Sequence, residues 1–391
     1  QSKESVIQLI NKTLMHNSDQ VMQEAVEKLE YHFMNAIRSL TKSKKTIGII
    51  SGHGEKTDAT INGFRDLISE NYTIIDIVEI KGQLNALDNI DCIIINNPTK
   101  HFTEKDKFII DQFIMRGGKS IWITAGTNAN MDSLERQSET IGMPIENRNL
   151  NDMLFKFGIR VNTDLVQDTQ ASPIPIVTHY IDQKPQWTFF PWTFFPIITP
   201  DNSHIINTSI NPIKCAFPSS IDTVNNHIKK TILLQTTSNT KINTAPVLIN
   251  LENIKEKPQE KLFNNGSKNI AILLEGVFKS VFHNRIPQKI KNDKNIQFKP
   301  NTRNQKGNSE SKNNKDGNTN QLIVISDGHF ITNQFEKGIH LPIGFDKHTR
   351  NQYGNGDFIL NCIDYLLGYD DFIETRNKNI NLRIIDKQKI Q

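Results

Sequence analysis

Cysteine and long apolar runs are both scarce in this chain of 391 residues. The three cysteines, Cys92, Cys215 and Cys362, are too few for a disulfide framework, and apolar surroundings favour buried free thiols for Cys92 and Cys362. No apolar run approaches the ~20 residues that span a bilayer, and no signal peptide is recognisable. Because the chain begins at Gln1, we interpret it as trimmed or as a fragment, so missing anchors do not argue against a membrane tether.

Nucleotide motifs and a catalytic nucleophile are also missing. The sequence contains no Gly-rich phosphate loop that ends in Lys-Ser/Thr and no dinucleotide fingerprint, so we expect no cofactor and no ATP hydrolysis. Flavodoxin-like hydrolases and amidotransferases carry Cys or Ser on a tight turn from strand to helix. After the expected strand 120–124, this chain has Ala125-Gly126-Thr127-Asn128 instead. The sequence therefore predicts a protein that is not an enzyme.

The positive charge is concentrated in one polar segment. The chain has a net charge of +4, and residues 284–320 hold nine Lys or Arg against three Asp or Glu. Aromatic residues do not interleave with these charges, so we expect no nucleic-acid partner. The segment has almost no apolar content, which predicts a disordered basic insertion that tolerates excision.

A repeating α/β pattern follows an N-terminal helical connector, 1–45, whose helix we expect over 18–40. Within 46–150, strands are expected at 46–50, 72–80, 92–96 and 120–124, with helices between them and Thr103 as a helix cap. Residues 321–370 supply a further strand, 322–325, and a helix, 355–367. Short, continuously apolar strands are typical of a buried parallel sheet, so strands 46–50, 92–96 and 322–325 should share one sheet.

The region 151–283 is expected to be rich in β-structure. A short helix at 149–157 precedes strand-like runs at 159–167, 174–181, 205–210, 231–236 and 246–251. Residues 187–196 repeat the unit Trp-Thr-Phe-Phe-Pro. This repeat is either an exposed aromatic binding surface or, as we favour, a packed or edge segment in which proline prevents regular pairing.

Two polar, glycine-containing loops follow expected parallel strands. Gly52, His53 and Glu55 lie in one, and Asp327 and His329 in the other. Ligands bind outside the carboxyl ends of such strands, so His53 and Asp327 are expected to approach across a crevice that contacts a ligand or partner. Acid–base or metal chemistry is one interpretation; glycine turns whose side chains bond backbone are the more ordinary one. We expect no metal site, because the ligand spacing is not diagnostic.

An ordered set of motifs resembles the GldG family, the auxiliary, substrate-binding-like components of gliding-motility-associated ABC transporters. The motifs are Leu29-Glu30-Tyr31-His32-Phe33, Gly52-His53-Gly54-Glu55, Phe189-Phe190-Pro191, Ser220-Ile221-Asp222, Leu274-Glu275-Gly276-Val277-Phe278-Lys279-Ser280, Asp327-Gly328, Leu341-Pro342-Ile343-Gly344-Phe345-Asp346-Lys347 and Gly354-Asn355-Gly356-Asp357-Phe358. The resemblance implies a flavodoxin-like or amidotransferase-like α/β fold with an inserted β-rich region, of ancestry shared with a domain of transporter auxiliary and intraflagellar-transport proteins.

The resemblance also implies a location and partners. It places the protein at the periplasmic face of the inner membrane, anchored by helices outside this chain, with residues 371–391 as a membrane-proximal tail. The implied partners are an ABC permease, GldF-like, and through it an ATPase, GldA-like. The function expected is therefore a non-catalytic auxiliary subunit for gliding motility. An amidotransferase-like hydrolase and a free solute-binding module are the alternatives.

Overall fold

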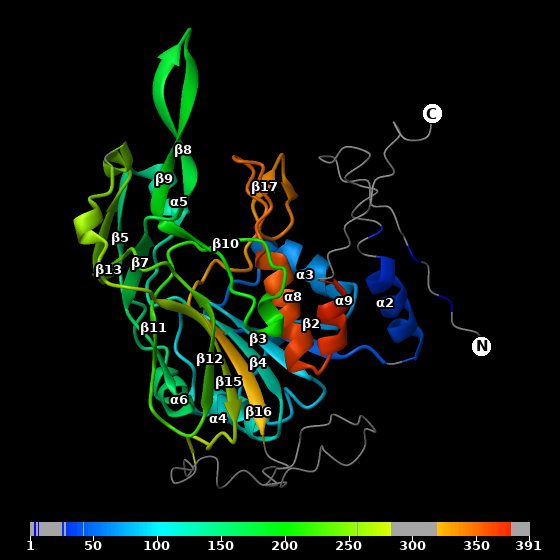
Figure 1. The fold of residues 1–391 in the computed structure, drawn as a ribbon. Helices are drawn as coiled ribbons and strands as arrows, with labels where there is room; N and C mark the ends of the chain where they lie inside the picture. The colour runs from blue at the N-terminus through cyan, green and yellow to red at the C-terminus, as the bar shows by residue number, and fades with distance from the viewer. Residues whose placement is uncertain are drawn as a thin grey trace, which may run out of the picture.

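The computed structural model describes residues 29–41, 43–255, 257–282 and 319–376, together with Glu4, Ile7 and Val26. Its architecture is mixed α/β, with one large, mainly parallel central sheet and smaller antiparallel sheets beside it (Figure 1). The α/β class expected from the sequence is therefore confirmed.

Five parallel strands form one side of the central sheet, in the order β2-β1-β3-β4-β16. They are β1 (Thr46–Ser51), β2 (Thr73–Glu79), β3 (Cys92–Asn96), β4 (Lys119–Ile123) and β16 (Asn320–Ile325). All five residues of β3 are buried, as expected for a strand covered on both faces. Strand β16 pairs with β4 despite about two hundred intervening residues, which confirms that the strand expected at 322–325 shares one sheet with those at 46–50 and 92–96.

Antiparallel strands extend this sheet beyond β16. They are β15 (Asn269–Gly276), β12 (Lys229–Gln235), β11 (Ile221–Thr223) and β6 (Ile159–Val161). Strand β15 joins the two halves by pairing with β16 on one side and with β11 and β12 on the other. Among the described strands, β6 pairs with β11 alone and forms the outer edge.

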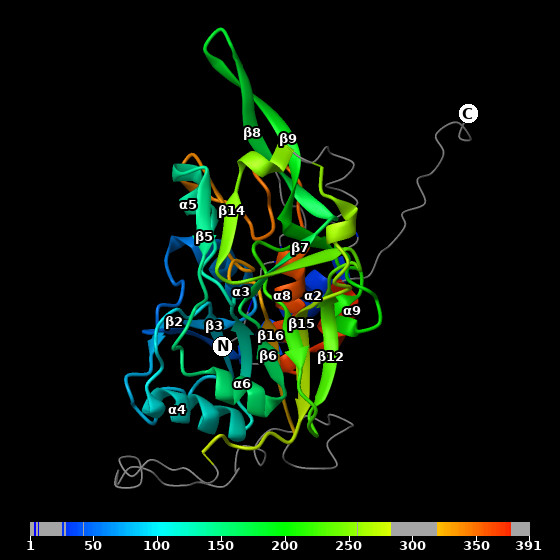
Figure 2. The ribbon, with the colours of Figure 1, turned by 90° about the vertical axis from the view of Figure 1, so that its left-hand side faces the viewer.

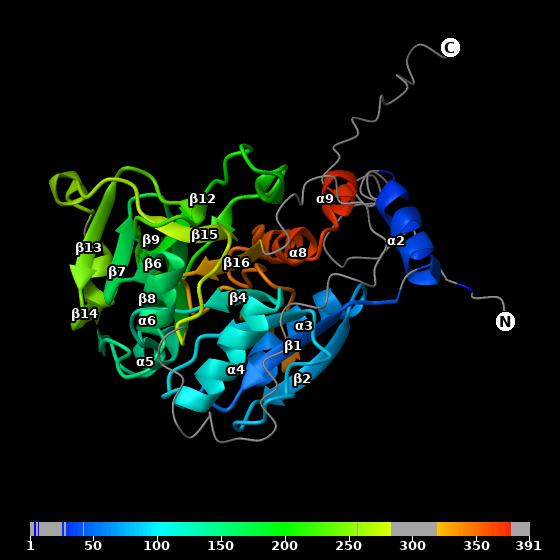
Figure 3. The same ribbon diagram turned by 90° about the horizontal axis from the view of Figure 1, so that it is seen from below.

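Helices cover both faces of the sheet (Figure 3). Helices α3 (Asn62–Ser69) and α8 (Asn355–Leu366) contribute to one apolar core, and α4 (Glu104–Met115) and α6 (Asn151–Phe157) to the other. Thr103 caps α4 as expected, because its hydroxyl accepts a hydrogen bond from the backbone N–H of Asp106. Each fully buried Ile side chain stabilises such cores by roughly 1.5–3 kcal/mol.

Two helices from opposite ends of the described chain pack together (Figure 1). They are α2 (Leu29–Thr41) and α9 (Asp370–Arg376). The guanidinium carbon of Arg38 on α2 lies 3.8 Å from the ring centroid of Tyr369, and Arg376 on α9 pairs with buried Asp364. The start of the expected C-terminal tail thus forms a helix that holds the expected N-terminal connector.

Besides β6, β11, β12 and β15 of the central sheet, the β-rich region contributes strands to three small antiparallel sheets. Their strands are β7 (Asp164–Asp168) with β13 (Thr240–Thr244), β5 (Glu139–Gly142) with β14 (Val247–Asn250), and β8 (Ala171–Ile181) with β9 (Lys184–Ile198) and β10 (Ile213–Lys214). The strand expected at 205–210 is wrong, since residues 205–207 form a 3-10 turn. His204 accepts a hydrogen bond from the N–H of Ile206 there, a local side-chain bond that competes with extended pairing.

Strands β8 and β9 form a long arm that projects from the body (Figures 1 and 2). The expectation that proline prevents pairing in the repeat is wrong, because the repeat lies within β9 and pairs with β8. Pro173 lies opposite Pro191, and two prolines cannot exchange N–H bonds, so this is a non-hydrogen-bonded pair. The backbone nitrogen of Pro175, two residues further along β8, faces the same side as that of Pro173. The outer edge of β8 therefore lacks an N–H donor at both positions.

The remaining elements are short. They are α5 (Met131–Arg136), β17 (Phe335–Glu336), β18 (Ile339–His340), and the 3-10 turns η1 (Ala59–Ile61), η2 (Ile205–Asn207), η3 (Glu252–Lys255) and η4 (Glu260–Leu262). Residues 283–318, which make up nearly all of the expected insertion 284–320, lie outside the described residues. Within the described part of the chain, no helix is long and apolar enough to cross a membrane.

Candidate functional site

The carboxyl edge of the parallel strands gathers the loops that the sequence singles out. Strand β1 leads into Gly52–Glu55, and β16 leads into Ser326–His329. Because both strands belong to one parallel set, their loops lie on the same edge of the sheet. Gly328 packs so closely on Asn97, after β3, that a Cβ at Gly328 would lie 2.4 Å from the Asn97 side chain. The loops therefore form one continuous surface.

His53 is held between two carboxylates. Its Nδ1 lies 3.2 Å from Oε1 of Glu55 and its Nε2 lies 3.2 Å from Oδ2 of Asp106, at the start of α4. The imidazole also stacks on Phe102, with ring centroids 3.7 Å apart. Burial alone would lower the pKa of His53, but the hydrogen bonds to Glu55 and Asp106 outweigh it and raise that pKa above 6.5. His53 thus connects the loop after β1 to the start of α4.

Lys56 connects the two loops, and sequence reasoning missed it. Its Nζ lies 3.0 Å from Nδ1 of His329, and Nε2 of His329 lies 3.2 Å from the carbonyl oxygen of Ala129. A carbonyl only accepts, so Nε2 of His329 carries the proton and Nδ1 accepts from Lys56. Burial lowers the pKa of His329 to about 3, and burial also lowers the pKa of Lys56. A lysine just after a glycine loop was the available signal.

Asp327 is a buried carboxyl group that binds backbone rather than His53. Its Oδ2 accepts from the N–H of Ala216 and its Oδ1 from the N–H of His329, both at 2.8 Å. Burial raises its pKa to about 7, although these bonds and the charge of Lys56 oppose the shift. Among the described residues, the bond between Lys56 and His329 links the loops of His53 and Asp327.

A cleft of about 720 Å³ opens beside Asp327 and His329, both of which line it. One wall is the outer edge of β8, residues 173–177, together with Trp187 of β9. Other lining residues come from the segment 344–348, including Phe345 and Asp346. A hollow of this size suits a ligand or a segment of a partner chain, and its place at the carboxyl edge is where open α/β sheets bind ligands.

The principal charges of the cleft are already paired. Nζ of Lys214 lies 2.5 Å from Oδ2 of Asp346. Burial opposes ionisation of Asp346, but the charge of Lys214 and its hydrogen bond hold the pKa of that carboxyl below 3.8. At these two residues, therefore, the cleft offers a charged ligand no unpaired charge.

The turn after β4, residues 125–128, is closely packed. A Cβ at Gly126 would lie 1.9 Å from the carbonyl oxygen of Asn162, and the Gly126 N–H donates to Oγ of Ser219 at 2.9 Å. The Thr127 side chain is buried, and Arg148 donates to the Ala125 carbonyl oxygen at 2.9 Å. Asn162 and Ser219 of the β-rich region thus pack directly against this turn.

Among the residues that the structure describes, no group of three or more His, Cys, Asp or Glu side chains is arranged to hold a metal ion.

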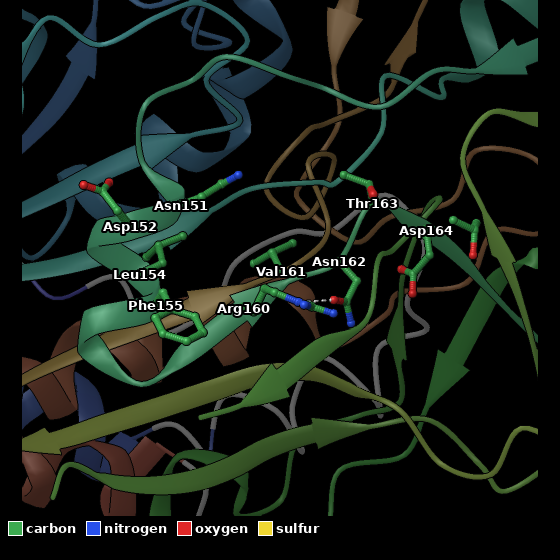
Figure 4. Close-up of a pocket in the computed structure, with 10 residues that line it drawn as sticks. Asn151, Asp152, Leu154, Phe155, Arg160, Val161, Asn162, Thr163 and Asp164 are labelled. Carbon is green, nitrogen blue, oxygen red and sulfur yellow. Dashed lines mark hydrogen bonds between the residues drawn. The ribbon is translucent and has the colours of Figure 1, made fainter. Parts of the chain in front are cut away.

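A second hollow, of about 800 Å³, lies against the outer edge of the sheet beside α6 and β6 (Figure 4). Nε of Arg160 donates to Oδ1 of Asn162 at 2.8 Å, and Asp164 accepts from the hydroxyl and N–H of Ser220. These polar groups satisfy one another, so the hollow has fewer groups available for a ligand than its size suggests.

The fold is mixed α/β, with a cleft beside the carboxyl edge of its parallel strands. Residues 44–362 match the family described as an ABC-type uncharacterized transport system, and the chain belongs to that family. No curated protein matches it. A solved structure titled "mmIFT52 N-terminal domain" is 14% identical over 83% of this chain and 97% of that chain, with a TM-score of 0.45.

Proposed function

We propose that the chain is a non-catalytic auxiliary subunit of an ABC transport system that serves gliding motility, on the periplasmic face of the inner membrane. Membership of the ABC-type transport family, over residues 44–362, is the observation that carries the proposal. The GldG-like motifs narrow it to gliding motility. The partners would be a GldF-like permease and, through the permease, a GldA-like ATPase.

The arrangement of the parallel strands supports the finer fold assignment. The order β2-β1-β3-β4-β16 follows the 2-1-3-4-5 pattern of flavodoxin-like sheets. We therefore propose a flavodoxin-like, amidotransferase-related parallel half with an inserted β-rich region. The close packing at Gly126 supports a non-catalytic role, because Asn162 and Ser219 of the inserted region lie directly against the turn.

Hydrolysis remains the second candidate, and one observation favours it. Asp327 lines the cleft and has a pKa of about 7, which suits a general acid or base. Both carboxyl oxygens nevertheless accept backbone hydrogen bonds, and the side chain is almost fully buried. This geometry favours a structural role in holding Ala216 of the β-rich region.

A free solute-binding module is the third candidate, and the cleft itself favours it. Its size and its mixture of aromatic and polar lining residues would suit a small solute. The permease distinguishes this candidate from the first, because a free module needs no stable membrane partner.

Co-purification from native membranes tests the proposed function. The full-length protein, carrying an affinity tag, is extracted in mild detergent, and the retained proteins are identified by mass spectrometry. We expect an ABC permease and its ATPase to be retained in constant ratio, and protease added to spheroplasts to digest this region. Recovery without any transport subunit, or protection from the external protease, would overturn the proposal.

A further inference from the structure

The cleft continues into an exposed aromatic face on the arm. Residues 173–177 of β8 and Trp187 line the cleft, and Phe189 lies two residues from Trp187 on the same face of β9. Tyr180, which pairs with Pro185, extends this face toward the tip. The exposed fractions of Trp187, Phe189 and Tyr180 are 57%, 47% and 69%. The apolar surface is therefore elongated, which fits a chain-like ligand better than a small solute.

The charges around the cleft favour an uncharged ligand. Lys214 and Asp346 neutralise each other, and Asp327 is held by two backbone donors with a pKa of about 7. The remaining formal charges of the lining, Lys347 and Asp132, are one of each sign. An ionic ligand would find no excess charge to complement, whereas an apolar ligand gives up no solvation of a charge of its own on entry.

The edge of β8 rules out ordinary strand addition. An added strand needs alternating donors and acceptors along the edge that it joins. At Pro173 and Pro175 the edge offers carbonyl oxygens but no N–H donor. A ligand must therefore donate to these carbonyls and gain its other contacts through side chains, as extended segments with unpaired backbone groups do when they dock on aromatic grooves.

We propose that the cleft and the aromatic face of the arm bind an extended, uncharged, apolar segment of a partner polypeptide, with Trp187 as the central contact. The proposal names what the auxiliary subunit would bind, and it rests on the proposed function. The peptide assay below reports the chemistry of the ligand, whereas co-purification reports the transporter, so each can fail without the other.

The chain carries its own optical reporter for this test. Of its three tryptophans, Trp122 and Trp192 are buried, and only Trp187 is exposed. Quenching of tryptophan fluorescence by acrylamide therefore reports on Trp187. An array of short synthetic peptides, balanced between apolar, acidic and basic sequences, is screened against the protein, and the peptides retained are then tested for protection of Trp187.

Matched variants distinguish a loss of binding contacts on the arm from a general change in the fold of the arm. Trp187→Ala removes the central contact, and Val177→Glu places a charge in the cleft while keeping the reporter. Thr188→Ala changes the neighbouring exposed residue on the opposite face of β9 and serves as the control. We expect uncharged apolar peptides to be retained, to protect Trp187, and to bind both cleft variants at least about tenfold more weakly, with the control unchanged.

Three results would overturn the inference. One is selection of acidic or basic peptides; another is equal binding by Trp187→Ala and Thr188→Ala. The third is protection of Trp187 by cello-oligosaccharides, or by vesicles of neutral lipid, when no peptide protects it. In that case the surface recognises a glycan or a membrane instead of a polypeptide.

Discussion

Lys56 and His329 are 273 positions apart in the chain, yet Nζ of Lys56 donates to Nδ1 of His329 across 3.0 Å. This bond joins the loop after β1 to the loop after β16. The β-rich region lies between these two loops in the sequence. The Nε2–H of His329 continues the link to the carbonyl oxygen of Ala129, after β4. One neutral imidazole thus ties together three loops at the carboxyl edge.

Asp327 and His329 should give opposite dependences of stability on pH. The pKa of Asp327 rises from 3.8 to about 7 on folding. Its contribution to the stability of the fold is therefore fully present below pH 3.8 and is lost as pH rises to about 7. The pKa of His329 falls from 6.5 to about 3, so its contribution is present above pH 6.5 and is lost as pH falls to about 3. Each shift corresponds to about 4–5 kcal/mol in the free energy of unfolding, and the two oppose each other between about pH 4 and 6.5.

Urea unfolding across this pH range tests the two shifts separately. Relative to the wild type, Asp327→Asn should gain stability as pH rises, whereas His329→Gln should lose stability. Difference curves of the same sign for the two variants, or flat curves for both, would show that these groups do not titrate as their burial requires.

Asn320 should be a costly residue to truncate. Its Nδ2 donates to the carbonyl oxygens of Ile114 and Gly118, at the end of α4, from a buried position in β16. We expect Asn320→Ala to lower the free energy of unfolding by about 1–3 kcal/mol, because two buried acceptors lose their donor. Asn351→Ala, at an exposed asparagine, is the control and should change it by less than about 0.5 kcal/mol. Equal losses in the two variants would refute the bonding.

The prolines on the outer edge of β8 should protect the protein from edge pairing. Pro175→Val restores an outward N–H beside the carbonyl of Pro173, so we expect greater self-association by analytical ultracentrifugation. Ile176→Val, whose N–H faces β9, is the matched control. An unchanged sedimentation profile for Pro175→Val would mean that the cleft geometry alone keeps strands from joining this edge.

Catalysis is expected to be absent. Esterase, glutaminase and peptidase substrates should all be turned over at background rates, since the turn at Gly126 and Thr127 is closed by Asn162 and Ser219. Turnover that is abolished by Thr127→Ala, by His53→Ala or by Asp327→Asn, in a folded protein, would establish the hydrolase alternative.

Local patterns were sufficient for the parallel half of the fold. Continuous apolar runs located β1, β3 and β16, and the cap at Thr103 located the start of α4, because burial on both faces and capping leave a direct trace in sequence. The β-rich region was less predictable. The sequence pattern does not predict β13, and it predicts a strand from Ile205, where the hydrogen bond that the His204 side chain accepts from the N–H of Ile206 favours a turn.

The candidate site was only partly predictable. Sequence reasoning placed the loops of His53 and Asp327 on one edge, because parallel strands end together. It did not predict that Glu55 and Asp106 hold His53, or that Lys56 reaches His329, since these choices depend on packing between distant segments. The sequence also does not show which unit of the aromatic repeat is buried. Trp192 and Phe194 of the second unit are buried, whereas Trp187 of the first is exposed.

Site-specific photo-crosslinking in native membranes tests most directly whether this chain joins a transport system through its cleft. A photoreactive phenylalanine analogue replaces Val177 in the cleft or, as the control, exposed Phe155 at the second hollow. The account predicts an adduct with an ABC transport subunit from position 177 and none from position 155. Absence of an adduct from position 177, or adducts that contain no transport protein, would contradict it.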